Sequence, residues 1–169
     1  VFNRLQNTIT GWPGGKPNSD DSTRPERAKP SKKRVILFSP HPDDDVISMG
    51  ATFIRLVEQG HDVHVAYQTS GNIAVHDHDA LRFAEFMQEF HEKAGIKCEP
   101  GFEIYQKSIQ FLKAKEQSEM TDIEEVKLIK GMIRRGEARA GARFVGLADD
   151  HIHFLDMPFY ETGKTRKKP

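Results

Sequence analysis

The sequence lacks the features that mark several large classes of protein. Its single cysteine, Cys98, cannot form a disulfide within the chain, which is typical of a reducing compartment. No apolar run approaches the ~20 residues that a membrane-spanning helix needs, and no signal peptide is recognisable. The 25 Lys and Arg residues equal the 25 Asp and Glu residues, so no net charge draws the chain to nucleic acid or to an anionic membrane. These absences predict a cytoplasmic protein with no nucleic-acid or membrane partner.

The 169 residues give room for one domain with a core, and are too few for two comfortable ones. Residues 1–33 are predicted to be a linker or an extended arm, because proline, glycine, serine and charge dominate residues 11–33 without apolar periodicity. The domain proper is predicted over residues 34–160, and residues 161–169 form a basic tail. Since the first residue is Val1 rather than methionine, we expect a piece of something longer.

The first half of the domain alternates between strand and helix patterns. The run RVILFS, residues 34–39, is short, apolar and rich in β-formers, as in a parallel strand that is covered on both faces. From Asp45 apolar residues recur at helical spacing until Gly60, and HDVHVAYQTSG then gives a second strand. This order predicts a three-layer α/β fold with a mainly parallel sheet, which binds ligands at the carboxyl ends of its strands.

The second half is predicted to be mainly helical before a third strand. A helix is expected over residues 78–94, Pro100 and Gly101 interrupt the pattern, and a long helix is expected from TDIEE at Thr121. The segment HIHFLDM, residues 151–157, has the pattern of a third strand. Five phenylalanines are predicted to lie in the core: Phe83, Phe86, Phe90, Phe111 and Phe144.

The segment SPHPDDDVISMG, residues 39–50, places three carboxylates and a histidine where the first strand gives way to a helix. A structural interpretation explains part of it, because aspartate is a good N-cap and carboxylates favour the positive end of a helix. That accounts for one or two of the aspartates, but three in succession repel one another. Charge clusters of this kind are typical of functional sites.

A bound metal ion would relieve that repulsion. His41 and Asp44 are three residues apart in a tight turn, so both can face one point, and zinc accepts imidazole nitrogen and carboxylate oxygen as ligands. Zinc, or another divalent metal, is therefore the predicted cofactor. Asp43 is left to act as a general base toward water beside the metal. Asp45, the first residue of the helix, is the best candidate for capping.

The stretch SPHPDDDVISMGATFIRLVEQGHDVHVAYQTSGN, residues 39–72, resembles the start of the LmbE/PIG-L family of zinc-dependent N-acetylglucosaminyl deacetylases. It is similar in particular to the LmbE-like domain that follows a glucosamine-6-phosphate deaminase domain in some bacterial fusion proteins. The resemblance covers residues 34–160 and implies a Rossmann-like fold. It also implies His41 and Asp44 as zinc ligands and Asp43 as the general base.

The sequence departs from the family pattern in two places. Asp45 stands where the family has glutamate, and the later histidine motif that supplies the family's third zinc ligand does not occur before Pro169. The chain therefore looks truncated. Four other histidines are weaker candidates for that ligand, at the start of the third strand or after the second: His151, His153, His76 and His78.

Substrate contacts are expected after the second strand and on the helices beyond it. Hydroxyl and amide groups can hold a sugar there, and arginine can bind a phosphate or a sugar hydroxyl. A plain turn and a solvated helix face are the alternatives. Arg134 belongs to a stretch that resembles an Arg-x-x-Glu pattern of the family. The predicted substrate-binding residues are Ser70, Gly71, Asn72, Arg82 and Arg134.

The leading prediction is a hydrolase that deacetylates an N-acetylated amino sugar of the N-acetylglucosamine type, with or without a phosphate. Self-association is also expected if apolar surface stays uncovered. The alternative is a non-catalytic sugar-binding or scaffolding domain of a larger glucosamine-6-phosphate deaminase fusion protein. A phosphorylated receiver domain is excluded by spacing, because Asp156 lies more than a hundred residues beyond Asp43. A dinucleotide-binding site is excluded because no Gly-x-Gly-x-x-Gly loop follows the first strand.

Overall fold

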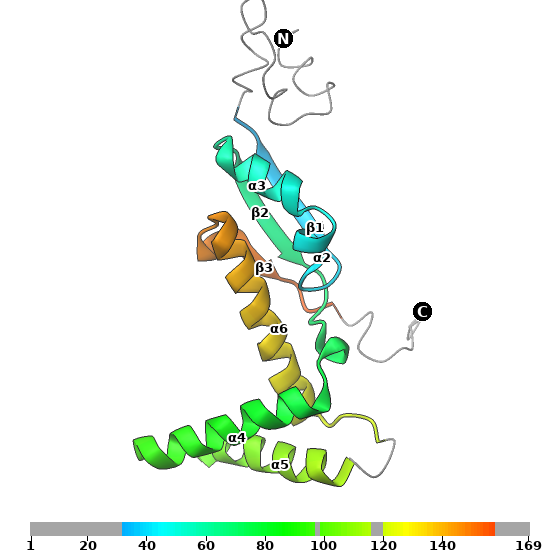
Figure 1. Ribbon diagram of the computed structural model, residues 1–169, viewed down its shortest axis with the longest axis vertical. Coiled ribbons are helices and arrows are strands. Elements are labelled where there is room, and N and C mark those ends of the chain that lie inside the picture. The colour runs from blue at the N-terminus through cyan, green and yellow to red at the C-terminus, as the bar shows by residue number, and fades with distance from the viewer. Residues whose placement is uncertain (1–31, 97–98, 116–119, 158–169) are drawn as a thin grey trace, which may run out of the picture. The chain divides into compact units, whose positions relative to one another are not determined.

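The computed structural model describes residues 32–96, 99–115 and 120–157 (Figure 1). None of the helices in these ranges is both long enough and apolar enough to cross a membrane. The elements follow in the order β1 (Arg34–Ser39), α2 (Asp44–Ile47), α3 (Gly50–Glu58), β2 (Asp62–Tyr67), η2 (Asn72–Ala74), α4 (Asp77–Ala94), α5 (Glu99–Lys115), α6 (Glu124–Val145), η3 (Asp149–His151) and β3 (Ile152–Phe154), where η2 and η3 are short 3-10 helices.

The chain divides into two compact units, and each is described by itself. Of the described residues, the first unit comprises 32–68 and 138–155, and the second comprises 69–96, 99–115, 120–137 and 156–157. The division falls within α6, so the end of this helix belongs to the first unit and its beginning to the second.

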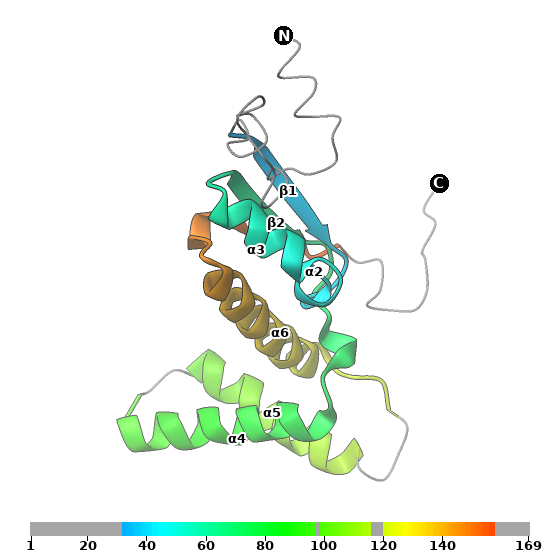
Figure 2. The ribbon, with the colours of Figure 1, turned by 45° about the horizontal axis from the view of Figure 1, so that its top comes forward.

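The first unit is built on a three-stranded parallel sheet in the order β1–β2–β3. Leu37 lies opposite Val65, and Val65 lies opposite Ile152. Because the strands run the same way, their carboxyl ends share one edge of the sheet, and Figure 2 shows α2 beside that end of β1. The predicted α/β class and parallel sheet are confirmed.

The core of the first unit lies on one face of this sheet. Leu37 and Val65 point to the same side, where they meet Phe53 of α3 and Ala142 of α6, and all four are at most 5% exposed. The helix α3 can cover the sheet because its apolar residues recur at helical spacing along one stripe. Full burial of a side chain such as that of Phe53 contributes roughly 1.5–3 kcal/mol.

The opposite face of the sheet carries large apolar side chains that remain accessible. Ile36 is 53% exposed and Phe38 is 55% exposed. The expectation that the strand at residues 34–39 is covered on both faces is therefore not met within the described part of the chain. An apolar run reports that each side chain favours burial, but it does not identify the surface that buries it.

The second unit contains α4 and α5, which lie side by side in both ribbon views (Figures 1 and 2). Its core joins Ala80, Leu112 and Val126, with Phe111 packed against them. The helix α5 was missed by the sequence analysis, which took Pro100 as a break. Proline is the second residue of α5, within the first turn, where its missing N–H leaves no helical hydrogen bond unmade.

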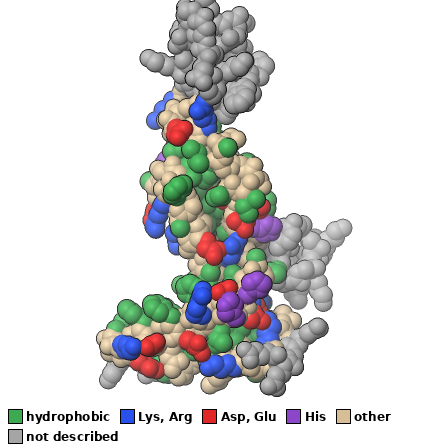
Figure 3. Space-filling model, viewed as in Figure 1, with side chains coloured by type: hydrophobic (Ala, Val, Ile, Leu, Met, Phe, Trp, Pro, Cys, Tyr) green, Lys and Arg blue, Asp and Glu red, His purple; other side chains and the backbone are tan. Residues whose placement is uncertain are grey.

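The prediction of a phenylalanine core is right for Phe111 and wrong for the other four. On α4, apolar residues at helical spacing form a stripe that is partly open to solvent, and Figure 3 shows hydrophobic side chains on the visible face of the α4–α5 pair. Spacing identifies such a stripe without showing what covers it. The exposed fractions are 43% for Phe83, 61% for Phe86, 50% for Phe90 and 87% for Phe144.

A network of two lysines and two aspartates joins the segments of the second unit. The ammonium group of Lys130, on α6, lies 2.5 Å from Asp77 at the start of α4 and 2.7 Å from Asp122. Lys115, at the end of α5, lies 2.9 Å from Asp77 and 2.5 Å from Asp122. Because Lys130 is only 5% exposed, removing these partners would leave a buried cation unpaired.

The network makes the stability of the second unit depend on pH. Burial raises the pKa of Asp77, but hydrogen bonds from Lys130 and Lys115 outweigh it and hold the pKa below the ordinary 3.8. A carboxyl whose folded pKa is lowered stabilises the fold above its unfolded pKa, and this contribution is lost as the pH falls through the folded pKa. Asp77→Asn should therefore lower stability at pH 7 and reduce the loss of stability as the pH falls below the ordinary carboxyl pKa of 3.8. Denaturant unfolding at pH 7 and below that pKa would measure both effects, with the exposed Asp150→Asn as the control. Equal acid sensitivity of wild type and Asp77→Asn would contradict the assignment.

Candidate active site

The HPDDD segment lies between β1 and α2, at the carboxyl edge of the sheet (Figure 2). Its turn is held by Ser39, the last residue of β1, which is fully buried. The Ser39 hydroxyl donates a hydrogen bond to the carbonyl oxygen of His41 at 2.6 Å and accepts one from the backbone N–H of Asp45 at 3.0 Å. One side chain thus fixes both ends of the turn.

His41 and Asp44 lie side by side in this turn. Nδ1 of His41 is 3.0 Å from Oδ2 of Asp44, and the same oxygen accepts the backbone N–H of His41 at 3.0 Å. Both side chains are partly accessible, at 39% and 32% exposure. A nitrogen donor and an oxygen donor at this separation fit two positions of a zinc ion's coordination sphere.

Asp43 adopts a backbone conformation that is unusual for an L-residue. Its φ is 129° and its ψ is −29°, a combination of backbone angles that residues with a Cβ atom rarely adopt. It stands at the N-cap position of α2, but its side chain makes no capping hydrogen bond and is exposed. Strain of this kind, which costs about 1–3 kcal/mol, is commonly found at functional sites.

Asp45 does not cap the helix, and that prediction is wrong. Its carboxyl group is 1% exposed and accepts a hydrogen bond from the Tyr67 hydroxyl at 2.8 Å. Burial raises the pKa of Tyr67 far above its ordinary value, and the neighbouring charge of Asp45 raises it further. The sequence analysis overlooked Ser39 and Tyr67. The inward position of Tyr67 on β2 could have indicated its role, because a buried tyrosine hydroxyl requires a hydrogen-bond partner.

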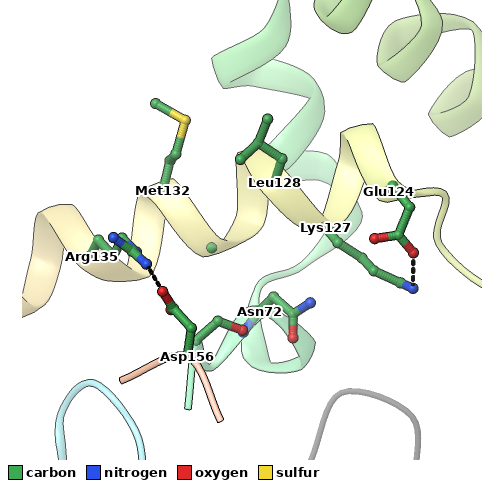
Figure 4. Close-up of a pocket in the computed structure, with 9 residues that line it drawn as sticks. Asn72, Glu124, Lys127, Leu128, Met132, Arg135 and Asp156 are labelled. Carbon is green, nitrogen blue, oxygen red and sulfur yellow. Dashed lines mark hydrogen bonds and ion pairs between the residues drawn. The ribbon is translucent and has the colours of Figure 1, made fainter. Parts of the chain in front are cut away.

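The residues predicted to bind substrate lie in the second unit. Ser70 and Asn72 line a pocket of about 460 Å³, together with Lys127, Arg135 and Asp156 (Figure 4). Asn72 is 5% exposed as a residue. In the pocket wall Arg135 forms an ion pair with Asp156, and Lys127 lies 2.6 Å from Glu124. The wall therefore offers both charges and amide groups to a polar ligand.

The remaining predicted residues of this group occupy a turn and two helices. Gly71 has a φ of 67°, the left-handed conformation that glycine adopts at low cost. Arg82, on α4, lies 3.0 Å from Asp79 and is 68% exposed. Arg134, on α6, lies 2.5 Å from Glu137. These ion pairs are the ones expected of helix surfaces at a spacing of three residues.

Among the described residues, one group of three or more potential ligands is close enough to surround a metal ion: Asp62, His64 and His151. It lies at the amino ends of β2 and β3, whereas His41 and Asp44 lie at the carboxyl edge. The sequence patterns gave His64 no metal-binding role and placed His151 among the weaker candidate ligands. The available signal was the pair of histidines at the starts of two strands that turn out to be neighbours.

The fold and the HPDDD turn define a class of protein: an α/β domain with a histidine–aspartate pair at the carboxyl edge of a parallel sheet. The family model that matches is PIG-L, described as GlcNAc-PI de-N-acetylase, and the match covers residues 36–168. The chain therefore belongs to the PIG-L family, whose deacetylases are metal-dependent amide hydrolases.

A glucosamine-6-phosphate deaminase-like protein of Bacteroides thetaiotaomicron is 56% identical to this chain over 170 residues. The aligned region covers 100% of this chain and 26% of that protein, so the chain spans about a quarter of the length of this curated relative. No solved structure matches the chain.

The strain at Asp43 predicts an unusual response to substitution. Asp43→Gly should raise the free energy of unfolding by about 1 kcal/mol. Glycine adopts a positive φ without the steric cost, and this gain exceeds the loss that comes from glycine's greater conformational entropy in the unfolded chain. Asp43→Ala keeps the Cβ atom and should not stabilise the protein. Urea denaturation of the two variants and the wild type measures the difference. If glycine and alanine have the same effect, the backbone at residue 43 is not strained.

Proposed function

We propose that this chain is the HPDDD-bearing part of a zinc-dependent deacetylase. Its substrate would be an N-acetylated amino sugar of the N-acetylglucosamine type, either with or without a phosphate group. One observation carries the proposal. In a chain of the PIG-L family, Nδ1 of His41 and Oδ2 of Asp44 lie 3.0 Å apart beside a strained Asp43.

His41 and Asp44 would supply two ligands to the zinc ion. Catalytic zinc sites usually have three protein ligands and one open position. All eight histidines of this sequence lie within the described residues, and none of them joins His41 and Asp44 as a candidate ligand group. We propose that a histidine of a longer protein supplies the third ligand, as the family resemblance implies and as the greater length of the relative allows. Ser39 and Tyr67 support the pair indirectly, since they hold the turn through Asp45.

When bound, zinc supplies Lewis-acid chemistry, which lowers the pKa of water and polarises a carbonyl group. Asp43 is the proposed general base: its exposed carboxylate takes a proton from the attacking water. The water oxygen bonds to the carbonyl carbon of the acetamide, and the bond from that carbon to nitrogen breaks. The proton held by Asp43 then goes to the leaving amine, which gives acetate and the amino sugar.

The pocket of the second unit supports a role in binding the sugar. Asn72 presents an amide that can donate and accept hydrogen bonds, and Ser70 adds a hydroxyl beside it. Lys127 and Arg135 supply positive charge that would favour a phosphorylated sugar. Gly71, Arg82 and Arg134 are proposed to assist from the adjoining turn and helices.

A second candidate function is a non-catalytic sugar-binding or scaffolding domain of a larger glucosamine-6-phosphate deaminase-like protein. It is favoured by the fact that the HPDDD turn brings together only two potential ligands among the described residues, and by the greater length of the relative. The two candidates differ in whether acetate is released.

The catalytic proposal predicts that Asp43→Asn lowers deacetylation by about 10²–10⁴-fold, because the amide cannot take the proton from water. Acetate release from N-acetylglucosamine and its 6-phosphate would be measured with the complete gene product loaded with zinc. Asp150→Asn makes the same chemical change at an exposed aspartate and should keep full activity. Undetectable acetate from the zinc-loaded wild type would favour the non-catalytic candidate.

The pocket predicts a separate effect on substrate binding. Asn72→Ala should raise KM by about tenfold with little change in kcat, because it removes hydrogen bonds that bind substrate and transition state alike. Gln110→Ala removes an exposed amide of α5 and is the matched control. An unchanged KM in Asn72→Ala would remove this pocket from the proposed sugar site.

A further inference from the structure

Four side chains that can bind metals gather at the amino ends of β2 and β3. Asp62 and His64 belong to β2, and His151 and His153 lie at the start of β3. Alternate residues of a strand share a face. Since His153 lies opposite Ala66 in the parallel register, all four residues lie on the same face of the sheet. None of them takes part in the proposed deacetylase mechanism.

The distances within this group suit a metal ion. Oδ1 of Asp62 lies 3.3 Å from Nε2 of His64 and 3.9 Å from Nδ1 of His151. The rings of His64 and His151 stack, with their centroids 4.1 Å apart, and one ligand atom from each of the three residues lies within 4.8 Å of the other two. Ligand atoms around a tetrahedral zinc ion are about 3.3 Å apart, because each lies about 2.0–2.1 Å from the metal.

Neighbouring groups already orient these side chains. Nε of Arg34 donates to Oδ2 of Asp62 at 2.6 Å, while Oδ1 is the oxygen nearest the histidines. This hydrogen bond from Arg34 lowers the pKa of Asp62, so the carboxylate is ionised at neutral pH. Nδ1 of His151 lies 2.8 Å from the carbonyl oxygen of Val63. In the neutral ring Nδ1 therefore donates to this carbonyl, so His151 must either turn Nε2 toward Asp62 or give up the bond to Val63 in order to bind a metal beside Asp62.

His153 orients His64 from the side of the ring that faces away from Asp62. Its Nε2 lies 3.0 Å from Nδ1 of His64, with the ring centroids 5.3 Å apart. The side chains of Asp62, His64 and His151 are 22–32% exposed, so an ion can enter and is then partly shielded from water. Two imidazoles and one carboxylate form a ligand set suited to zinc and to similar transition metals, in contrast to the all-oxygen sets that magnesium and calcium prefer.

We propose that Asp62, His64 and His151 form a transition-metal site, for zinc in the first place, that is separate from His41 and Asp44. His153 positions the ring of His64 through the opposite nitrogen. An ion bound there joins β2 to β3 at the amino end of the sheet and stabilises the folded chain. The site does not depend on the proposed deacetylase function.

The test is a calorimetric zinc titration of the metal-stripped chain in a His41→Ala/Asp44→Ala background, which lacks the ligand pair of the carboxyl edge. We expect about one zinc ion per chain, and a rise in Tm of about 5–10 °C at a zinc concentration near 100 times Kd. Adding His64→Ala or His151→Ala should weaken zinc binding by more than about tenfold. His78→Ala is the matched control, because it removes an exposed histidine that also lies beside a carboxylate, 3.6 Å from Asp79.

Cobalt gives a second measurement. Four-coordinate Co²⁺ in the same background should show visible absorption bands that disappear in the His64→Ala and His151→Ala variants but persist in His78→Ala. The Tm of each variant in chelator should equal that of the background, which separates loss of the ligand from loss of the fold. The proposal is overturned if zinc does not bind, if both variants bind it as tightly as the background, or if His78→Ala weakens binding equally. Because the background lacks His41 and Asp44, these outcomes leave the deacetylase proposal untouched.

Discussion

The hydrogen bond between the Tyr67 hydroxyl and the buried carboxyl of Asp45 is the interaction on which the candidate site depends. A carboxyl that is 1% exposed must be hydrogen-bonded, because burying it without partners costs several kcal/mol. Tyr67 satisfies one of its oxygens at 2.8 Å, and the backbone N–H of Asp45 is taken by Ser39. The tyrosine hydroxyl also lies 3.3 Å from the carbonyl oxygen of Ala138 on α6. One buried contact therefore fixes the start of α2 against β1, β2 and α6. His41 and Asp44 project from the turn that this contact fixes.

The sequence was informative where chemistry is local. The repulsion among three consecutive aspartates beside a histidine pointed to the turn at residues 41–45, and in the structure His41 and Asp44 lie in contact there. The alternation of strand and helix patterns indicated the α/β class. Both signals depend only on neighbours in the chain, so they can be read without knowing how the elements pack.

The sequence was less informative where the answer depends on residues far apart in the chain. Asp45 has the sequence context of a cap, and only the approach of Tyr67, 22 residues later, makes it a buried acceptor. His64 and His151 are 87 residues apart, and their stacking follows from the pairing of β2 with β3. The exposed phenylalanines of α4 show the same limit, since helical spacing does not tell which surface, if any, covers a stripe.

The exposed side of β1 bears on how the protein behaves in concentrated solution. Ile36 and Phe38 stand two residues apart on one strand, so they form a continuous apolar ridge rather than isolated contacts with water. Salts that are excluded from protein surfaces, such as sulfate, strengthen the tendency of such a ridge to leave water, and urea weakens it. Because the formal net charge is zero at pH 7, mutual repulsion between molecules is weak, so excluded salts should lower the solubility of the chain.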